Sequence, residues 1–126
     1  ELLQKSEALS VHKKILKESL ANPIITSVVP QEISARSNTI LTIHGSNFDK
    51  NIEVELRPRT KIISIKPSVI LDQTKIFRES DSIIQVRIDA GLLSSDNYKE
   101  YYLYGIYVKN MNSKRTSNGE TIKVNL

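Results

Sequence analysis

The spacing of the apolar residues changes at Asn22-Pro23, and this change divides the chain into two parts. Residues 1–21 contain neither glycine nor proline, and their apolar residues recur at helical spacing. This pattern predicts one amphipathic α-helix of about five turns, since a turn holds about 3.6 residues. Proline disfavours helical backbone for the residue before it, so we expect the helix to end at Asn22. Its leucine stripe is Leu2, Leu9, Leu16 and Leu20.

After Pro23, apolar and polar residues alternate, which is the period of a β-strand. In residues 52–57, Ile52, Val54 and Leu56 fall on one side and charged residues on the other. Comparable short runs occupy residues 24–29, 39–44, 61–65, 69–71, 82–89, 101–109 and 121–126, and residues 75–78 form a weaker candidate. No helical pattern separates them, so they predict an all-β protein with seven or eight strands in an antiparallel β-sandwich.

The predicted domain organisation is a helical connector over residues 1–22 followed by the sandwich over residues 23–126. No segment approaches the ~18 apolar residues that a membrane-spanning helix needs. The first residue is Glu1 rather than methionine, so we expect the sequence to be an excised or processed piece of a longer protein.

Several phrases of the second part carry a resemblance to a known family. Residues 23–30 read Pro-Ile-Ile-Thr-Ser-Val-Val-Pro, and residues 39–48 form a β-rich phrase that ends in Gly-Ser-Asn-Phe. Residues 105–110 and the pair Ser117-Asn118 match further phrases near the end. Over about residues 22–126 the chain thus resembles the IPT/TIG family of immunoglobulin-like domains. The resemblance implies an immunoglobulin-like, non-catalytic module. Such modules occur in bacterial surface and secreted proteins, beside carbohydrate-active enzymes, and in some eukaryotic transcription factors and receptors.

The matched residues have structural interpretations. Gly45 and Asn47 both tolerate a positive φ, so we expect a turn over residues 45–47. Phe48 is expected to close the end of the sandwich. The chain departs from the family pattern in residues 57–80 and 90–102, and we expect any property particular to this domain to lie in those two segments.

The composition argues against an enzyme. Cysteine is absent, which excludes disulfides, thiol catalysis and Cys-ligated zinc or iron–sulfur clusters. The two histidines, His12 and His44, provide little material for a metal site or a catalytic relay. The carboxylates Asp89, Asp96 and Glu100 match no calcium-loop spacing, so we predict neither metal nor cofactor.

All five tyrosines lie within residues 98–107, and Tyr101 and Tyr107 have the parity opposite to Ile106 and Val108. Exposed tyrosines stack on sugar rings or anchor protein partners. The candidate residues for contact with a partner or a glycan are Tyr98, Tyr101, Tyr107, Leu92 and Leu93. The competing interpretation is that strands simply favour tyrosine and that these rings cover the edge of the sandwich.

Basic residues slightly exceed acidic ones, 18 Lys and Arg against 14 Asp and Glu, for a net charge of +4. They are spread along the chain, whereas nucleic-acid binding usually requires a cluster. The densest basic segment contains Arg57, Arg59 and Lys61, and it is a weak candidate for contact with an anion.

We therefore expect a non-catalytic structural or binding module of a larger bacterial protein of the surface, secreted or phage-tail-like kind. Its role would be spacing, assembly or partner contact, and its location extracytoplasmic. One alternative is an accessory carbohydrate-binding domain that uses residues 98–107. A second is an immunoglobulin-like domain that contacts DNA through loops such as residues 57–61. The leucine stripe of residues 1–21 is expected to pack on a neighbouring domain as an assembly helix.

Overall fold

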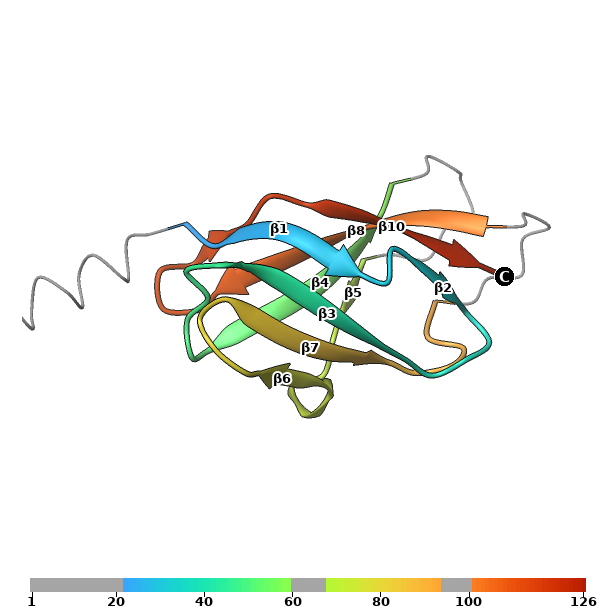
Figure 1. Ribbon diagram of the computed structural model, residues 1–126, viewed down its shortest axis with the longest axis horizontal. Helices are drawn as coiled ribbons and strands as arrows, with labels where there is room; N and C mark the ends of the chain where they lie inside the picture. Colours follow the sequence, from blue (N-terminus) through green and yellow to red (C-terminus); the bar gives the residue numbers. More distant parts are fainter. Residues whose placement is uncertain (1–21, 60–67, 94–100) are drawn as a thin grey trace, which may run out of the picture.

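A computed structural model describes residues 22–59, 68–93 and 101–126, and this part of the chain folds into a β-sandwich (Figure 1). The predicted helix, with Leu2, Leu9, Leu16 and Leu20, lies outside the described residues. So do the predicted strand over residues 61–65 and the side chains of Lys61 and Tyr98. No helix in the described part is long and apolar enough to cross a membrane.

The described residues form ten strands and one 3-10 helix, η1. The strands are β1 (Ile24–Val29), β2 (Glu32–Ser34), β3 (Thr39–Ser46), β4 (Ile52–Pro58), β5 (Val69–Ile70), β6 (Ile76–Arg78), β7 (Ile83–Ile88), β8 (Tyr101–Asn110), β9 (Arg115–Thr116) and β10 (Glu120–Asn125). The helix η1 (Gln73–Lys75) begins after Asp72, whose carboxylate accepts hydrogen bonds from the backbone N–H and the hydroxyl of Thr74.

The strands form two packed sheets. One has the order β1-β3-β7-β6, and the other has the order β2-β10-β8-β4-β5 with β9 also on β8. Every pair is antiparallel except β2 with β10, which is parallel. The prediction of a wholly antiparallel sandwich is therefore wrong at this edge. The chain runs from β1 into β2 without a hairpin reversal, so β2 meets the opposite sheet in the direction of β10 (Figure 1).

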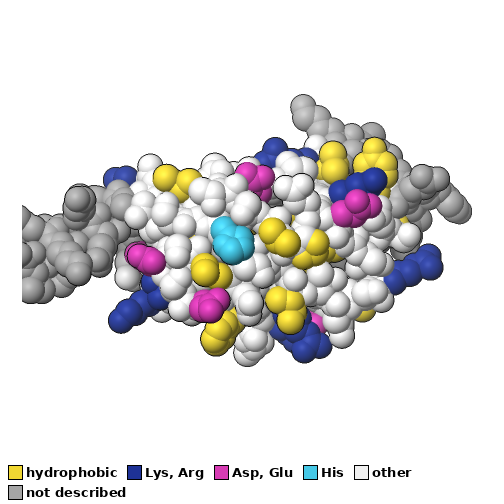
Figure 2. All heavy atoms as spheres, in the orientation of Figure 1, with side chains coloured by type: hydrophobic (Ala, Val, Ile, Leu, Met, Phe, Trp, Pro, Cys, Tyr) yellow, Lys and Arg dark blue, Asp and Glu magenta, His cyan; other side chains and the backbone are white. Residues whose placement is uncertain are grey.

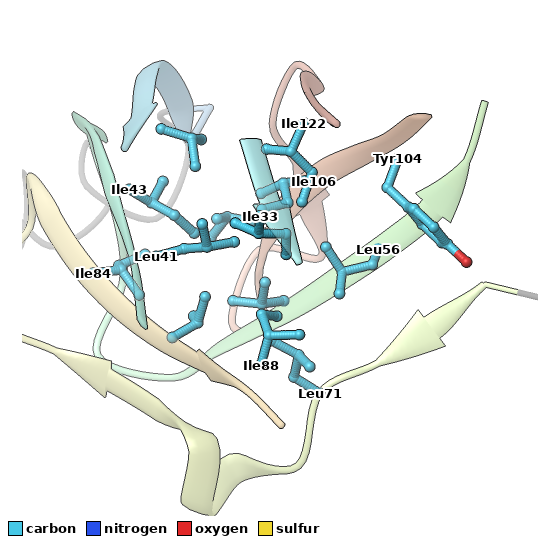
Figure 3. Close-up of a cluster of buried hydrophobic side chains, with 14 of the residues drawn as sticks. Ile33, Leu41, Ile43, Leu56, Leu71, Ile84, Ile88, Tyr104, Ile106 and Ile122 are labelled. Carbon is cyan, nitrogen blue, oxygen red and sulfur yellow. The ribbon is translucent and has the colours of Figure 1, made fainter. Parts of the chain in front are cut away.

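The core lies between the sheets and is made by alternate residues of the strands, as the sequence predicts. Ile52, Val54 and Leu56 of β4 are all buried. Figure 3 shows residues of the first sheet, such as Leu41 and Ile84, pointing toward residues of the second. Other buried side chains of the core include Ile43, Phe48, Val86, Ile88, Tyr102, Tyr104, Ile106 and Ile122. Phe48 is buried, and burial also raises the pKa of the Tyr104 phenol.

The turn expected at residues 45–47 begins later than the sequence predicts. Gly45 lies inside β3, opposite Ile25, and only Asn47 has a positive φ, at 64°. Gly45 is needed for close packing: a methyl group in its place would lie 1.9 Å from the backbone oxygen of Ile24 and 2.5 Å from Cζ of Phe48. Its expected role as a positive-φ turn residue is therefore wrong.

Asn118 ties the two sheets together. It lies between β9 and β10, and its side-chain amide uses both backbone groups of Ile25 in β1. The Ile25 N–H donates to Oδ1 of Asn118 at 2.8 Å, and Nδ2 of Asn118 donates to the Ile25 carbonyl at 2.9 Å. Because β1 is an edge strand of its sheet, this amide pairs with backbone groups that no strand reaches. We call this contact the Asn118 clasp.

Asn22, the first described residue, is held to the same end of the sandwich. Nδ2 of Asn47 donates to the Asn22 carbonyl at 3.1 Å, and Arg115 donates to the Asn22 side chain at 3.0 Å. Asn110, fully buried at the end of β8, donates in turn to the Asn47 carbonyl at 2.7 Å. These contacts fix the direction in which the chain enters β1.

Candidate functional site

The tyrosines of β8 divide between the two sides of the sheet as their parity predicts. Tyr102 and Tyr104 point into the core and are 2% exposed. Tyr101 is 47% exposed and Tyr107 is half-buried, both on the outer side of the larger sheet. The predicted parity of these four tyrosines is confirmed, and the outward pair lies on a central strand of its sheet.

The structure brings Tyr107 together with Arg57, on the neighbouring strand β4, and with Arg59, just after the end of that strand. In the pairing of β4 with β8, Glu55 lies opposite Tyr107, and Arg57 lies opposite Gly105. The Arg57 guanidinium lies 4.2 Å from the centre of the Tyr107 ring, which is a cation–π contact. Nη2 of Arg59 donates to the Tyr107 hydroxyl at 3.4 Å. One residue of the tyrosine candidate and two residues of the basic candidate, predicted separately from the sequence, therefore lie on one surface.

Gly105 and Gly119 lie directly beneath the side chains of this surface. A methyl group at Gly119 would lie 2.5 Å from Cζ of Tyr107 and 2.6 Å from Nη2 of Arg59. At Gly105 it would lie 2.7 Å from Nε of Arg59 and 2.9 Å from Cε2 of Tyr107. The ring and the guanidinium thus rest directly on the sheet because these positions have no side chain. We call Arg57, Arg59, Gly105, Tyr107 and Gly119 the Tyr107 face.

Sequence reasoning missed these glycines, although a signal was present. Gly105 and Tyr107 share the outward parity of β8, so a glycine stands where an outward side chain is expected. Gly119 precedes β10, and the register that places Glu120 opposite Ile106 brings residue 119 beside Tyr107. The first relation can be read along one strand, whereas the second requires the pairing of two strands.

The two arginines of the Tyr107 face differ in their charge partners. Arg57 forms an ion pair with Glu55. Arg59 is exposed and, among the described residues, is in no ion pair. Its described polar partner is the neutral Tyr107 hydroxyl. The face therefore presents one positioned guanidinium that can receive a carboxylate or another anion.

The predicted leucine contacts do not belong to this surface. Leu93 is 1% exposed and lies in the core, and Leu92 packs against the core. The chain turns back here because the N–H of Gly91, at a φ of 86°, donates to the Ala35 carbonyl at 2.7 Å. The prediction of Leu93 as an exposed contact residue is therefore wrong.

The tyrosine rings are partly covered by cations, which bears on the predicted glycan stacking. A sugar stacks on an open aromatic face. Arg57 lies over the Tyr107 ring, and Nζ of Lys123 lies 4.6 Å from the centre of the Tyr101 ring. A sugar ring would have to displace these cations to stack there.

The outer side of the four-stranded sheet is different, and we call it the small-sheet face. Its exposed large apolar residues are Ile24, Val29, Ile40 and Phe77. Figure 2 views this side of the molecule, where the hydrophobic side chains form separate groups among the backbone and other side chains. The charges beside it are paired with each other: Asp89 binds Lys75 at 3.0 Å and Arg87 at 2.8 Å. The hydrogen bond from Lys75 is the main reason that the pKa of Asp89 is lowered.

Within the described residues, no group of three or more His, Asp or Glu side chains could hold a metal ion. His44 lies on β3 opposite Ile83, on the outer side of the small sheet. Asp89 is engaged by its two cations, while Asp96 and Glu100 lie outside the described residues.

Comparison with known protein families matches residues 23–102, more than half of the chain, to the IPT/TIG domain. No curated protein matches the chain. Among solved structures, the chain is similar to the TIG domain of human nuclear factor of activated T-cells, cytoplasmic 4. The identity is 14% and the TM-score 0.59, over 82% of this chain and 88% of that one. It is also similar to a chain of the complex of Dpr1 IG1 with DIP-eta IG1, at 13% identity and a TM-score of 0.39, over 85% and 95% of the two chains. The first likeness supports the fold, and the second, at that TM-score, carries no argument.

Proposed function

Since the chain belongs to the IPT/TIG family of immunoglobulin-like domains, we propose that it is a non-catalytic contact module of a larger protein. Its partner is another protein surface, or another domain of the same polypeptide, that presents a carboxylate to the Tyr107 face. The parent protein is a bacterial surface or secreted protein, in which the module contributes to spacing and assembly. The occurrence of the family in such proteins supports this location, and fractionation of cells that express the full-length gene product tests it.

The position of Arg59 is the observation that carries the proposal. Its guanidinium rests on Gly105 and Gly119 and is steadied by the Tyr107 hydroxyl, so little side-chain freedom remains to be lost on binding. It has no acidic partner among the described residues. Arginine and tyrosine are also the residue types that most often contribute strongly to protein interfaces. The arrangement favours a planar anionic group that meets the guanidinium through two hydrogen bonds.

The other candidate partners fit this surface less well. The cations over the tyrosine rings oppose glycan stacking, as described above. Contact with DNA depends on several unpaired cations that neutralise phosphates, whereas Arg57 is already paired with Glu55. A protein carboxylate requires only the one unpaired guanidinium that the face provides.

The test is a titration of the chain with a synthetic glutamate-rich peptide, followed by NMR chemical shifts of the backbone amides. We expect shifts concentrated on β4, β8 and β10, and we expect them to weaken as salt screens the charges. Arg59→Ala should weaken binding about tenfold or more, which is the range of an interface arginine.

Arg87→Ala is the matched control, because it removes the same charge from the opposite side of the sandwich. Retained binding in Arg87→Ala with lost binding in Arg59→Ala supports the Tyr107 face. Equal weakening by both variants would show that only net charge matters, and the proposal would be wrong.

A further inference from the structure

Asn118 and Gly119 form the only Asn-Gly pair in the chain, and each residue is required by a different contact. The clasp uses both ends of the asparagine amide, because Oδ1 accepts from the Ile25 N–H while Nδ2 donates to the Ile25 carbonyl. The Tyr107 face needs a glycine next to it, because any side chain would meet Tyr107 and Arg59. Asn-Gly is also the sequence in which the asparagine side chain is most open to attack by the following backbone nitrogen, since glycine offers no steric hindrance.

We propose that Asn118 is a site of spontaneous deamidation and that the clasp controls its rate. The Gly119 nitrogen loses its proton to water or hydroxide and attacks Cγ of Asn118. A bond forms between that nitrogen and Cγ, water returns a proton to Nδ2, the bond from Cγ to Nδ2 breaks, and ammonia leaves. Water then opens the resulting succinimide at one of its two carbonyls, giving aspartate or isoaspartate at position 118.

The clasp slows the first step because it fixes the side chain that must rotate. Both polar atoms of the amide are bound to Ile25, at 2.8 and 2.9 Å, and a rotation of the side chain toward the Gly119 nitrogen would break these bonds. The reaction therefore follows local opening of β1 from the clasp. The residue itself is exposed, so water for the second step is at hand.

Deamidation breaks the clasp, and the product cannot form it again. An aspartate carboxylate has no hydrogen to donate to the Ile25 carbonyl, and its oxygens repel that carbonyl. Isoaspartate also adds one carbon to the backbone and displaces Gly119 from beneath Tyr107 and Arg59. Deamidation thus converts a transient opening of β1 into a permanent loosening of the inter-sheet contact, and it alters the Tyr107 face.

The test incubates the full chain at mildly alkaline pH, once in native buffer and once in guanidinium, and measures aspartate and isoaspartate at position 118 by peptide mapping. We expect conversion in both, at least about tenfold slower in the native chain because opening limits it. Val28→Ala removes a buried contact of β1 and should speed native conversion. Val54→Ala, the same substitution at a buried position of β4 in the other sheet, should speed it less.

A second measurement tests how the loss of the clasp changes the melting temperature. The encoded variant Asn118→Asp should melt about 4–8 °C below the wild type, as should deamidated wild-type chain. Equal rates of deamidation in the folded and the unfolded chain would show that the clasp does not slow the reaction. Absence of conversion at position 118 in guanidinium would overturn the site itself, and an unchanged melting temperature of Asn118→Asp would overturn the structural consequence.

Discussion

The two outer faces of the sandwich use glycine and arginine for opposite purposes. On the sheet that carries the small-sheet face, Gly45 makes room for the backbone oxygen of Ile24, and Arg87 is paired with Asp89. On the Tyr107 face, Gly105 and Gly119 make room only for side chains, and Arg59 is left without a described acidic partner. A glycine packed against backbone is therefore needed for folding, whereas a glycine packed against side chains determines the shape of a surface.

The largest expected effect tests this distinction with two glycines. Gly45→Ala should destabilise the domain by more than about 4 kcal/mol, because the new methyl group meets backbone that cannot move aside. Gly119→Ala should cost only about 1 kcal/mol, because the atoms it meets belong to surface side chains that can turn toward solvent. Urea denaturation of both variants measures the difference.

Peptide binding gives a second test of Gly119→Ala. Gly119→Ala should lose the glutamate-rich peptide although it folds, because Arg59 and Tyr107 can no longer lie on the sheet. If Gly119→Ala were as unstable as Gly45→Ala, Gly119 would be needed for folding rather than for the shape of the Tyr107 face, and the distinction between the two glycines would be wrong.

A smaller effect separates the two sides of one strand. Ile43 and Ile40 both lie in β3, but Ile43 is fully buried whereas Ile40 is 61% exposed. Ile43→Ala should cost about 2–5 kcal/mol, mainly through the cavity it leaves. Ile40→Ala should change stability by less than about 0.5 kcal/mol. An equally large loss at Ile40 in the full chain would mean that another part of the chain covers the small-sheet face.

The smallest effect is electrostatic and belongs to Asp89. Its pKa is lowered in the folded state, chiefly by the hydrogen bond from Lys75. Asp89 therefore adds stability that is present above its unfolded pKa of about 3.9 and is lost as pH falls through the lower folded value. Asp89→Asn should flatten the acid limb of a plot of melting temperature against pH and leave the neutral region almost unchanged. If the steep acid limb persists in the variant, other carboxylates cause the loss of stability at low pH.

The sequence predicted the elements in which local pattern and burial agree. The alternation in β4 and β7 foretold which residues are buried, because the strand period alone sets the side on which each side chain lies. The parity of the β8 tyrosines was predicted for the same reason.

What the sequence did not reveal depends on which strands become neighbours. The strand β2 has three residues and β9 has two, which is too short for a periodic signal, and the parallel partner of β2 lies far along the chain. The meeting of Arg57 and Arg59 with Tyr107 likewise follows from the register of β4 with β8. Leu93 was placed on the surface because a loop pattern does not show that its backbone turns back toward Ala35.

The anchoring of Asn22 also has a mechanical consequence. Residue 22 and the end of β10 lie at opposite ends of the sandwich, so tension along the polypeptide enters through β1 and leaves through β10 (Figure 1). The load on β1 is shared by its ladder with β3 and by the amide of Asn118, while Asn47 and Arg115 hold the point at which force is applied. Strands loaded along their length strain many hydrogen bonds at once, so we expect the sandwich to resist stretching from these two ends.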